Sequence, residues 1–280
     1  MTWLILASTA AVLFSLNSLL GRVLAVKSQN PRAFAFVYNL FGALFALGLW
    51  FLHPQPISNV PPLAWQLLVL SIILYGVFNR FEFYARKHVE SSTLSILTKF
   101  IPVITFTLSI VIWKETVTLN KLLAAALIIG GTMAAVYKKG RIEFNQGLKY
   151  AAIIIVSLGL AWTVDKKASS YFPLALYAFA TYLPPNIFLL PFPFLKWSQI
   201  VTEIKLANWK IAFLAFVNMT AYYTLISAFQ YGEASKVVLI TSTSTILTVI
   251  AGITLLKERE NISRKIVAAL IVVIGALLLK

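Results

Sequence analysis

The side chains best able to do chemistry in this chain lie inside long apolar runs. Lys99 lies in one such run, and Glu82, Arg80 and Asn79 lie toward the end of the run before it. A charge in the hydrocarbon core is costly, so it faces a bundle interior or a watery cavity and has a partner. If the chain turns near Glu90, Lys99 and Glu82 reach similar depths in an antiparallel hairpin. The spacing therefore predicts that Lys99 pairs with Glu82.

This polar group supports two interpretations. In the first, Lys99 and Glu82 bind the carboxylate or amine of a transported substrate, or Glu82 carries a coupling proton. In the second, they form a structural pair that fixes one helix against the next, as buried ion pairs do elsewhere. Asn79 lies three residues before Glu82 and shares its helix face. Arg80 points aside, where it either pairs with Glu82 or reaches another helix.

The composition indicates a membrane protein that crosses the bilayer many times. Of the 280 residues, 60% are hydrophobic and 12% are charged, whereas soluble domains have about 45–50% apolar and about 25% charged residues. We expect an all-α membrane protein of the cell (inner) membrane. The net charge of +15 lies mostly at segment ends, where Lys and Arg meet anionic lipid headgroups. The expected partner is therefore the lipid bilayer, and nucleic acid is not expected.

The remaining residue types narrow the chemistry further. The chain has no Cys, a single Asp, and two His residues without metal-ligand spacing, so we expect neither a metal site nor another cofactor. An intramembrane enzyme would need paired aspartates or an H-E-x-x-H motif. The sequence has neither, so we expect a protein that is not an enzyme. It also lacks the phosphate-binding pattern G-x-x-x-x-G-K-[ST], which argues against ATP as a direct driver of transport.

Ten apolar segments of roughly membrane-spanning length follow one another along the chain. About twenty apolar residues cross the hydrocarbon core as a helix, and short polar breaks separate the candidates. The sequence therefore predicts ten transmembrane helices joined by short loops. They cover Trp3–Ala25, Arg32–Leu52, Leu63–Ala85, Ser91–Trp113, Leu119–Tyr137, Leu148–Ala168, Pro173–Leu195, Trp209–Gln230, Ser235–Leu256 and Ile262–Leu279.

The chain also repeats itself at an offset of 143 residues. An odd number of spans in each copy turns the copies opposite ways across the bilayer, a pattern typical of transporters with a midplane substrate site between the repeats. We therefore expect two inverted five-helix repeats, residues 1–140 and 141–280. The overlaid pairs include Glu90 with Glu233, Thr98 with Thr241, Lys114-Glu115 with Lys257-Glu258, and Ala125-Ala126-Leu127 with Ala268-Ala269-Leu270.

Two long runs carry a family resemblance. Leu94–Glu115 and Val238–Glu258 are apolar stretches with small and hydroxyl residues that end in an acidic residue. Each leads into a segment rich in small residues, Leu122–Val136 or Ile266–Leu279. This arrangement resembles the EamA branch of the drug/metabolite transporter superfamily. The resemblance implies ten helices in two inverted five-helix repeats, a central cavity and alternating access. It also implies similarity to exporters of amino acids and other small metabolites.

Further candidate substrate-binding residues lie on the segments expected to line this cavity. Asn17 lies in the middle of the first segment, and Trp162 of the sixth offers a ring that can stack on a substrate. Asn218 and Tyr222 are four residues apart on one face of the eighth segment, and Tyr222 overlays Asn79. The alternative for each is structural, because such groups also pack in cores and form interhelical hydrogen bonds.

The ninth segment contributes hydroxyl groups to the candidate site. Thr241 and Ser242 overlay Thr98 and Lys99, so these hydroxyls could coordinate a polar substrate. Alternatively, they bond back to the carbonyls of their own helix and bend it. Asp165 of the sixth segment is followed directly by two lysines, and this charge cluster favours a solvated helix end.

Together these features predict a secondary transporter that works by alternating access and moves a small polar metabolite, such as an amino acid, outward. Protons are the candidate coupling ion, through Glu82. The alternative within transport is a nucleotide-sugar or sugar-phosphate carrier, in which Lys99 and Arg80 bind phosphate. A non-transporting membrane scaffold is a further alternative, against which the repeat and the intramembrane charges argue.

The orientation of the chain is open at this point. Basic residues are more numerous after the odd-numbered segments than after the even-numbered ones. Because short cytoplasmic loops carry an excess of Lys and Arg, this asymmetry places both termini outside. The family resemblance implies that both termini are inside.

Overall fold

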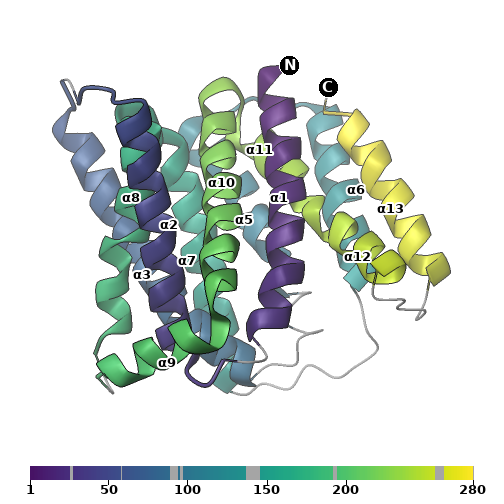
Figure 1. Ribbon diagram of the computed structural model, residues 1–280. Coiled ribbons are helices and arrows are strands. Elements are labelled where there is room, and N and C mark those ends of the chain that lie inside the picture. Colours follow the sequence, from purple (N-terminus) through teal and green to yellow (C-terminus); the bar gives the residue numbers. More distant parts are fainter. Residues whose placement is uncertain are drawn as a thin grey trace.

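A computed structural model describes residues 1–25, 28–57, 59–88, 94, 97–136, 146–191, 194–255 and 262–279, which are helical or irregular and contain no strand (Figure 1). Both chain termini lie at the same end of the helical bundle in Figure 1. Glu90, Lys257 and Glu258, which the repeat overlay uses, lie outside the described residues.

The helices lie where the apolar segments predict them, although several segments are divided. In the first half they are α1 (Thr2–Ala25), α2 (Pro31–Leu52), α3 (Pro62–His88), α5 (Phe100–Trp113) and α6 (Leu119–Val136). In the second half they are α7 (Gln146–Ala168), η1 (Ser169–Tyr171), α8 (Leu174–Tyr182), η2 (Pro184–Leu189), α9 (Trp197–Ala207), α10 (Trp209–Tyr231), α11 (Ala234–Ser242), α12 (Ser244–Leu255) and α13 (Ile262–Leu277).

Many of these helices are apolar and long enough to cross a membrane. Among the described residues, six candidate spans have that length and composition, and three apolar helices are shorter. The chain is therefore a multi-pass membrane protein, while the count of ten spans stays a prediction. The six are Thr2–Gly21, Pro31–Leu52, Pro62–Glu82, Gln146–Tyr171, Trp209–Tyr231 and Ala234–Ala251, and the shorter ones are Phe100–Trp113, Leu119–Ala135 and Leu174–Leu189.

The fourth predicted segment is interrupted by a turn at Thr98 and Lys99, and α5 begins at Phe100. The cause lies one turn further on, at Pro102. Proline has no N–H to donate to the carbonyl of the residue four positions earlier, here Thr98, and its ring crowds that carbonyl. Instead, the N–H of Ile101 donates to the Thr98 carbonyl in a tighter turn, at 3.1 Å.

The ninth predicted segment breaks at Thr243, between α11 and α12. At the repeat offset this position overlays Phe100, so the two copies are interrupted at matching places. No proline is needed here, because three successive hydroxyls compete for helix carbonyls. Those of Thr241, Ser242 and Thr243 all donate back to carbonyls of their own helix. These contacts are the ones that the back-bonding alternative describes, and the role of this segment in substrate binding stays a prediction.

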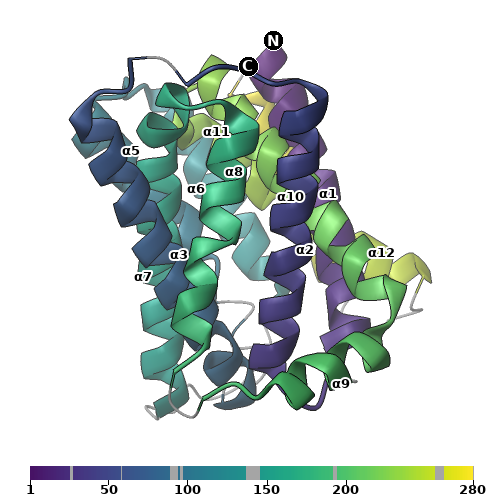
Figure 2. The same ribbon diagram turned by 60° about the vertical axis from the view of Figure 1, so that its left-hand side comes forward.

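The sequence prediction of short loops fails between the seventh and eighth segments. Pro184 and Pro185 end α8 and start the 3₁₀ helix η2, and the amphipathic helix α9 follows, crossing one end of the bundle (Figure 2). The buried carboxylate of Glu203 on α9 accepts hydrogen bonds from the N–H groups of Gln29 and Asn30, at 2.8 and 2.7 Å. Thus α9 holds the start of α2.

The contact between α6 and α13 reveals the internal symmetry. A Cβ added to Gly131 would lie 2.7 Å from Cγ2 of Val272, and one added to Gly275 would lie 2.9 Å from Cγ1 of Ile128. Shifting Gly131 forward by 144 positions gives Gly275, and shifting Val272 back by 144 positions gives Ile128, so the two contacts are equivalent in the two copies. The later residue of one helix contacts the earlier residue of the other. The equivalent helices of the two copies are therefore antiparallel. Gly130, by contrast, has open space where a Cβ would be.

The remaining helices follow the same symmetry. The helix α3 of the first half packs mainly on α7 and on the α8–η2 region of the second half, and we call this group the second bundle. Its counterpart, the first bundle, is α10 packed on α1 and α2. The two bundles meet where α2 contacts α8, and α5 contacts α11 beside them. Each bundle thus contains helices of both repeats, and the α2–α8 contact between the bundles also joins the two repeats.

Candidate functional site

A fully buried carboxylate occupies the interior between the two bundles. Asp165 on α7 is 0% exposed. Its Oδ1 accepts hydrogen bonds from the hydroxyls of Ser71 (3.1 Å) and Tyr177 (2.6 Å). Its Oδ2 accepts hydrogen bonds from the hydroxyls of Tyr75 (2.6 Å) and Tyr222 (2.9 Å). We call these five residues the Asp165 cage.

The cage joins the two bundles through one tyrosine. Tyr222 extends from α10 of the first bundle, whereas the other members lie on α3, α7 and α8. Its ring contacts those of Tyr75 and Tyr182 edge-on, each at 5.8 Å between centroids. One turn earlier on α10, the Asn218 amide donates to the Tyr182 hydroxyl at 2.6 Å. The face that the sequence predicted for Asn218 and Tyr222 is therefore turned toward the bundle interface.

The prediction of a solvated helix end at Asp165 is wrong. The neighbouring Lys166 does not draw Asp165 toward solvent, because its ammonium reaches away to the carbonyls of Phe229 and Gly232. Those carbonyls belong to the last turn of α10 and the residue after it, so Lys166 binds the negative end of that helix. Lys166, whose charge suggested a solvated end of α7, instead binds the C-terminal end of α10.

Lys99 lies at the break of the fourth segment and is half-buried. Its ammonium donates to the hydroxyl of Thr245, in the first turn of α12. The pair with Glu82 that hairpin depth predicted is not formed, because the ion pairs among the described residues do not include Lys99. Lys99 therefore joins the interrupted helices of the two repeats and does not join two neighbouring helices of one repeat.

The other candidates on α3 lie on different sides of the helix. Arg80 donates to the carbonyls of Phe188 (3.3 Å) and Pro191 (2.5 Å), so it reaches another element, as one alternative predicted. These contacts fix the end of η2. Asn79 is half-buried and lies four residues after Tyr75, on the same face of α3. Glu82 is half-buried one turn further on.

The candidates on α1 and α7 contact other elements across the fold. Trp162 stacks on Phe14 of α1, with 6.3 Å between ring centroids and 30° between ring planes. Asn17 accepts a hydrogen bond from the Tyr38 hydroxyl of α2 at 3.1 Å. Thr98 is half-buried beside Lys99, at the helix break. The structure thus places these side chains in the interior, and their role in binding stays a prediction.

Sequence reasoning missed most of the cage. Two signals were available: Asp165 is the only Asp of the chain, and Ser71, Tyr75 and Asn79 follow one another at four-residue spacing on one helix face. Neither signal shows that Tyr177 lies close to them, because α8 meets α3 only through tertiary packing.

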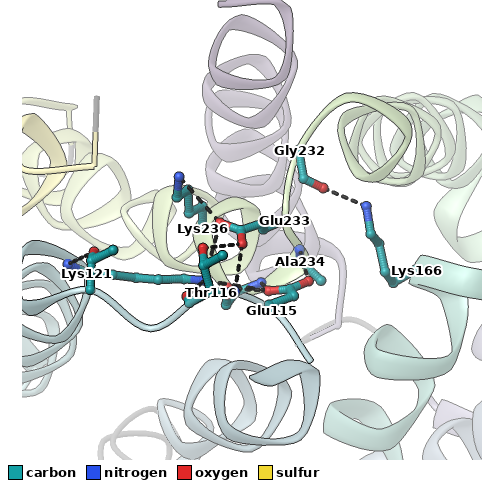
Figure 3. A network of polar contacts seen from close by, with 10 residues as sticks. Glu115, Thr116, Lys121, Lys166, Gly232, Glu233, Ala234 and Lys236 are labelled. Carbon is teal, nitrogen blue, oxygen red and sulfur yellow. Dashed lines mark hydrogen bonds and ion pairs between the residues drawn. The ribbon is translucent and has the colours of Figure 1, made fainter. Parts of the chain in front are cut away.

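A second polar cluster joins the two halves near the chain termini, and Figure 3 shows it from close by. Glu115, just after α5, accepts hydrogen bonds from the N–H groups of Ala234 (2.7 Å) and Ser235 (3.0 Å), and from the Ser235 hydroxyl. These are the first residues of α11, so Glu115 of one repeat satisfies the free donors at a helix start in the other.

Glu233 makes the reciprocal contact. Its carboxylate accepts hydrogen bonds from the N–H (3.0 Å) and hydroxyl (2.7 Å) of Thr116, and it pairs with Lys121 at 3.2 Å. Burial alone raises the pKa of Glu233, but the Thr116 hydrogen bonds and the charge of Lys121 outweigh it and lower the pKa to about 2. We call Glu115, Thr116, Lys121, Glu233 and Ser235 the end cluster.

The architecture and the interior polar groups define a multi-pass helical membrane protein of two repeats, with its polar side chains gathered at the repeat interface. A family model described as "EamA-like transporter family" matches residues 1–137 and 145–280. The chain therefore belongs to the EamA-like transporter family, as the resemblance predicted.

A solved structure titled "Crystal structure of protein" shares the fold. Its TM-score is 0.78, the identity is 15%, and the match covers 99% of this chain and 96% of that chain. At that identity the likeness shows the fold alone. No curated protein matches the chain.

Proposed function

We propose that this protein is a secondary transporter that exports a small metabolite with a carboxylate group, such as an amino acid, across the cell (inner) membrane. In this proposal residues 1–140 and 141–280 are inverted five-helix repeats that together make ten spans. They rock about a site between them to give alternating access. The observation that carries the proposal is the position of Lys99 at the paired helix breaks.

Lys99 has the features of an anion-binding residue. Its ammonium contacts a neutral hydroxyl, that of Thr245, and it is not among the ion pairs of the described chain. An intramembrane cation with no carboxylate partner favours a substrate that brings its own negative charge. Hydrogen bonds to charged groups contribute about 1.5–3 kcal/mol, enough for a carboxylate to be recognised here.

The helix breaks strengthen this positive site. The half-helices α5 and α12 both begin at the interruption, and helix N-termini carry a partial positive charge. Broken helices that point their N-termini at an anionic substrate group are a recurring design in transporters. We therefore assign the substrate carboxylate to the Lys99 ammonium, where it would replace the hydroxyl of Thr245 as the hydrogen-bond acceptor.

The rest of the substrate would contact groups around this anchor. Asn79 and Asn218 offer hydrogen bonds, and Trp162 offers an apolar face. The hydroxyl of Tyr222 already donates to Asp165, so we assign Tyr222 to the wall of the site and not to direct hydrogen bonding. Thr98, Thr241 and Ser242 lie at the breaks themselves. The hydroxyls of Thr241 and Ser242 already bond to helix carbonyls, so we assign these residues to shaping the break and not to direct contact.

A ligand-stabilisation screen on purified protein tests this function. The arms are the L-amino acids, their methyl esters, sugar phosphates and nucleotide sugars. We expect L-amino acids to raise the thermal denaturation midpoint and their uncharged esters not to do so. In Lys99→Ala the affinity for the best ligand should fall about 10- to 100-fold, in line with a lost charged hydrogen bond of about 1.5–3 kcal/mol.

The same screen can contradict the proposal. Stabilisation by phosphorylated ligands alone would assign the protein to the nucleotide-sugar or sugar-phosphate carriers, with Lys99 as a phosphate ligand. Equal affinity of Lys99→Ala and the wild type for an amino acid would remove Lys99 from the site. Any stabilising ligand should then show counterflow in proteoliposomes, because a scaffold protein would bind without exchange.

A further inference from the structure

Asp165 is an interior ionisable group that the proposed substrate site does not use. It is fully buried, and its partners are four hydroxyls. Ionised groups in a protein interior cost several kcal/mol unless charge pairing or hydrogen bonds compensate. The ion pairs of the described residues do not include Asp165. Its charge is therefore held by neutral donors alone.

The titratable groups that face Asp165 come from three of the helices packed around it. They are Tyr75 on α3, Tyr177 on α8 and Tyr222 on α10. On its own helix, Lys166 is turned away to carbonyls at the end of α10. On the other side, α5 contacts backbone carbonyls of α7 through Thr105 and Trp113, which do not titrate. Among the residues that the structure describes, no cation pairs with Asp165 to hold it in its charged form.

The cage can accommodate either protonation state. An ionised carboxylate accepts up to four hydrogen bonds, as observed, whereas the neutral acid needs one acceptor for its own O–H. Each hydroxyl oxygen in the cage can accept as well as donate. The Ser71 and Tyr177 hydroxyls are also 3.0 Å apart, and either can donate to the other. A proton can therefore add to a carboxylate oxygen while one hydroxyl turns its hydrogen to a neighbour, with no other bond changed.

The cage also links protonation to the position of the bundles. Tyr222 is the member that comes from the first bundle, and it contributes one of the four observed hydrogen bonds. If the bundles rock apart, Asp165 loses this donor and its charged form loses stabilisation. A proton that binds more readily in one conformation shifts the equilibrium toward that conformation.

A hollow at one end of the bundle is formed in part by residues that lie close to two members of the cage along the chain. It is lined by the end of α2, the first turn of α8 and Tyr223 of α10. Tyr223 is the neighbour of Tyr222, and Leu174 in the same hollow lies one turn before Tyr177. Protons that enter the hollow would therefore reach the helices that carry two of the three tyrosines of the cage.

We propose that Asp165 is the residue that binds the coupling proton of this transporter. This inference rests on the proposed function, and it moves the coupling proton from Glu82, which the sequence favoured, to the cage. Asp165→Asn keeps the size of the side chain and one acceptor oxygen, so it tests titration with little change in packing. Glu203→Gln is the matched control, since Glu203 is also buried, but it binds backbone N–H groups outside the bundle interface.

The experiment uses proteoliposomes and a mixture of radiolabelled L-amino acids as the probe. Two transport modes are measured, counterflow without a gradient and accumulation driven by a pH gradient of one unit. For one proton per substrate, the gradient supplies about 1.4 kcal/mol and about tenfold accumulation. We expect Asp165→Asn to retain counterflow and to lose this accumulation. Glu203→Gln and Glu82→Gln should keep both, and Asp165→Glu should restore the response to pH.

The outcomes separate this inference from the proposed function. If the wild type shows no counterflow with any tested substrate, the transport proposal itself fails. If the wild type accumulates substrate and Asp165→Asn accumulates it equally, the coupling assignment is overturned while transport stands. Loss of accumulation in Glu82→Gln, with Asp165→Asn unaffected, would return the coupling proton to Glu82. If Asp165→Asn is too unstable to reconstitute, proton release on substrate addition is compared in detergent between wild type and Asp165→Glu. A pH-independent release in both variants would contradict the proposal.

Discussion

The two polar clusters of this protein hold their carboxylates in opposite ways. In the end cluster, Glu233 pairs with Lys121 and accepts hydrogen bonds from Thr116. In the cage, Asp165 accepts four hydrogen bonds from hydroxyls and has no cationic partner among the described residues. The comparison teaches that a cation fixes a carboxylate in its charged form, whereas neutral donors leave it able to take up a proton.

Their places in the fold match this difference. The end cluster closes one end of the interface between the repeats. There Glu233 can take up a proton only if its contacts with Lys121 and Thr116 break. The cage lies between the bundles, where a proton can be exchanged without separating the helices. One cluster is therefore suited to holding a conformation, and the other to sensing which conformation is present.

The largest expected effect comes from removing the acceptor of the cage. Asp165→Ala leaves up to four buried hydroxyls without their carboxylate, and each buried group left unsatisfied costs about 1–3 kcal/mol. Thermal denaturation in detergent should show a much lower midpoint than for Asp165→Asn, which keeps one acceptor oxygen. Equal midpoints for the two variants would mean that the hydroxyls find other partners and that the cage does not depend on Asp165.

The second-largest effect is expected from removing the cation of the end cluster, which leaves its carboxylates with neutral donors, as in the cage. Lys121→Met keeps the length of a side chain that is only 2% exposed and removes the cation near Glu115 and Glu233. We expect a stability loss of about 1–3 kcal/mol, because a buried partner is removed. The pKa of Glu233 should also rise from about 2 toward its ordinary value. Thermal midpoints measured between pH 3 and pH 7 should therefore fall less on acidification than those of the wild type, because the folded-state pKa of Glu233 then lies closer to its unfolded value.

The apolar contact between α6 and α13 supplies a reference with no ionisable group at the contact. Gly131→Ala places a methyl group 2.7 Å from Val272 and 3.1 Å from a backbone carbonyl, and overpacking of this kind costs about 1–3 kcal/mol. The loss should be the same at every pH. Gly130→Ala is the matched control, since nothing lies within 4 Å of its added Cβ. A similar loss in both variants would contradict the antiparallel contact.

The smallest effect concerns the acid limit of the wild type. The folded-state pKa of Glu233 is lowered to about 2 from its ordinary value of 4.5, so its stabilisation is present above about pH 4.5 and is lost as the pH falls toward 2. Glu233→Gln removes this dependence, and its stability curve should be flatter over that window. The side chain is 25% exposed, so solvent screening keeps the effect small. A steeper acid loss in the variant would contradict this reading.

The sequence was sufficient for the elements but not for their contacts. The lengths of the apolar runs predicted the segments, and the 143-residue offset indicated two copies. Both can be read from the order of residue types alone, without any knowledge of contacts. The helix α9 was missed because it is short and amphipathic, and so reads as a loop between apolar segments. The break at Lys99 has a local cause in Pro102, and the break at Thr243 fits the hydroxyl back-bonding that the sequence offered as one of two alternatives.

The site was less accessible to sequence reasoning than the fold. Hairpin depth suggested Glu82 as the partner of Lys99, but the helix break turns Lys99 toward Thr245 in the other repeat. Asp165 was assigned to solvent because two lysines follow it, although Lys166 binds the end of α10. In both cases the decisive partner is distant in sequence, and the inverted packing of the two copies brings it close.

The most direct test of the contrast between the two clusters is the pH dependence of gradient-driven uptake, measured in proteoliposomes for Asp165→Asn and Glu233→Gln side by side. We predict that Asp165→Asn loses the response to the pH gradient, whereas Glu233→Gln retains the wild-type response. A retained response in Asp165→Asn together with a lost response in Glu233→Gln would contradict the account, because it would place the exchangeable proton at the end of the bundle.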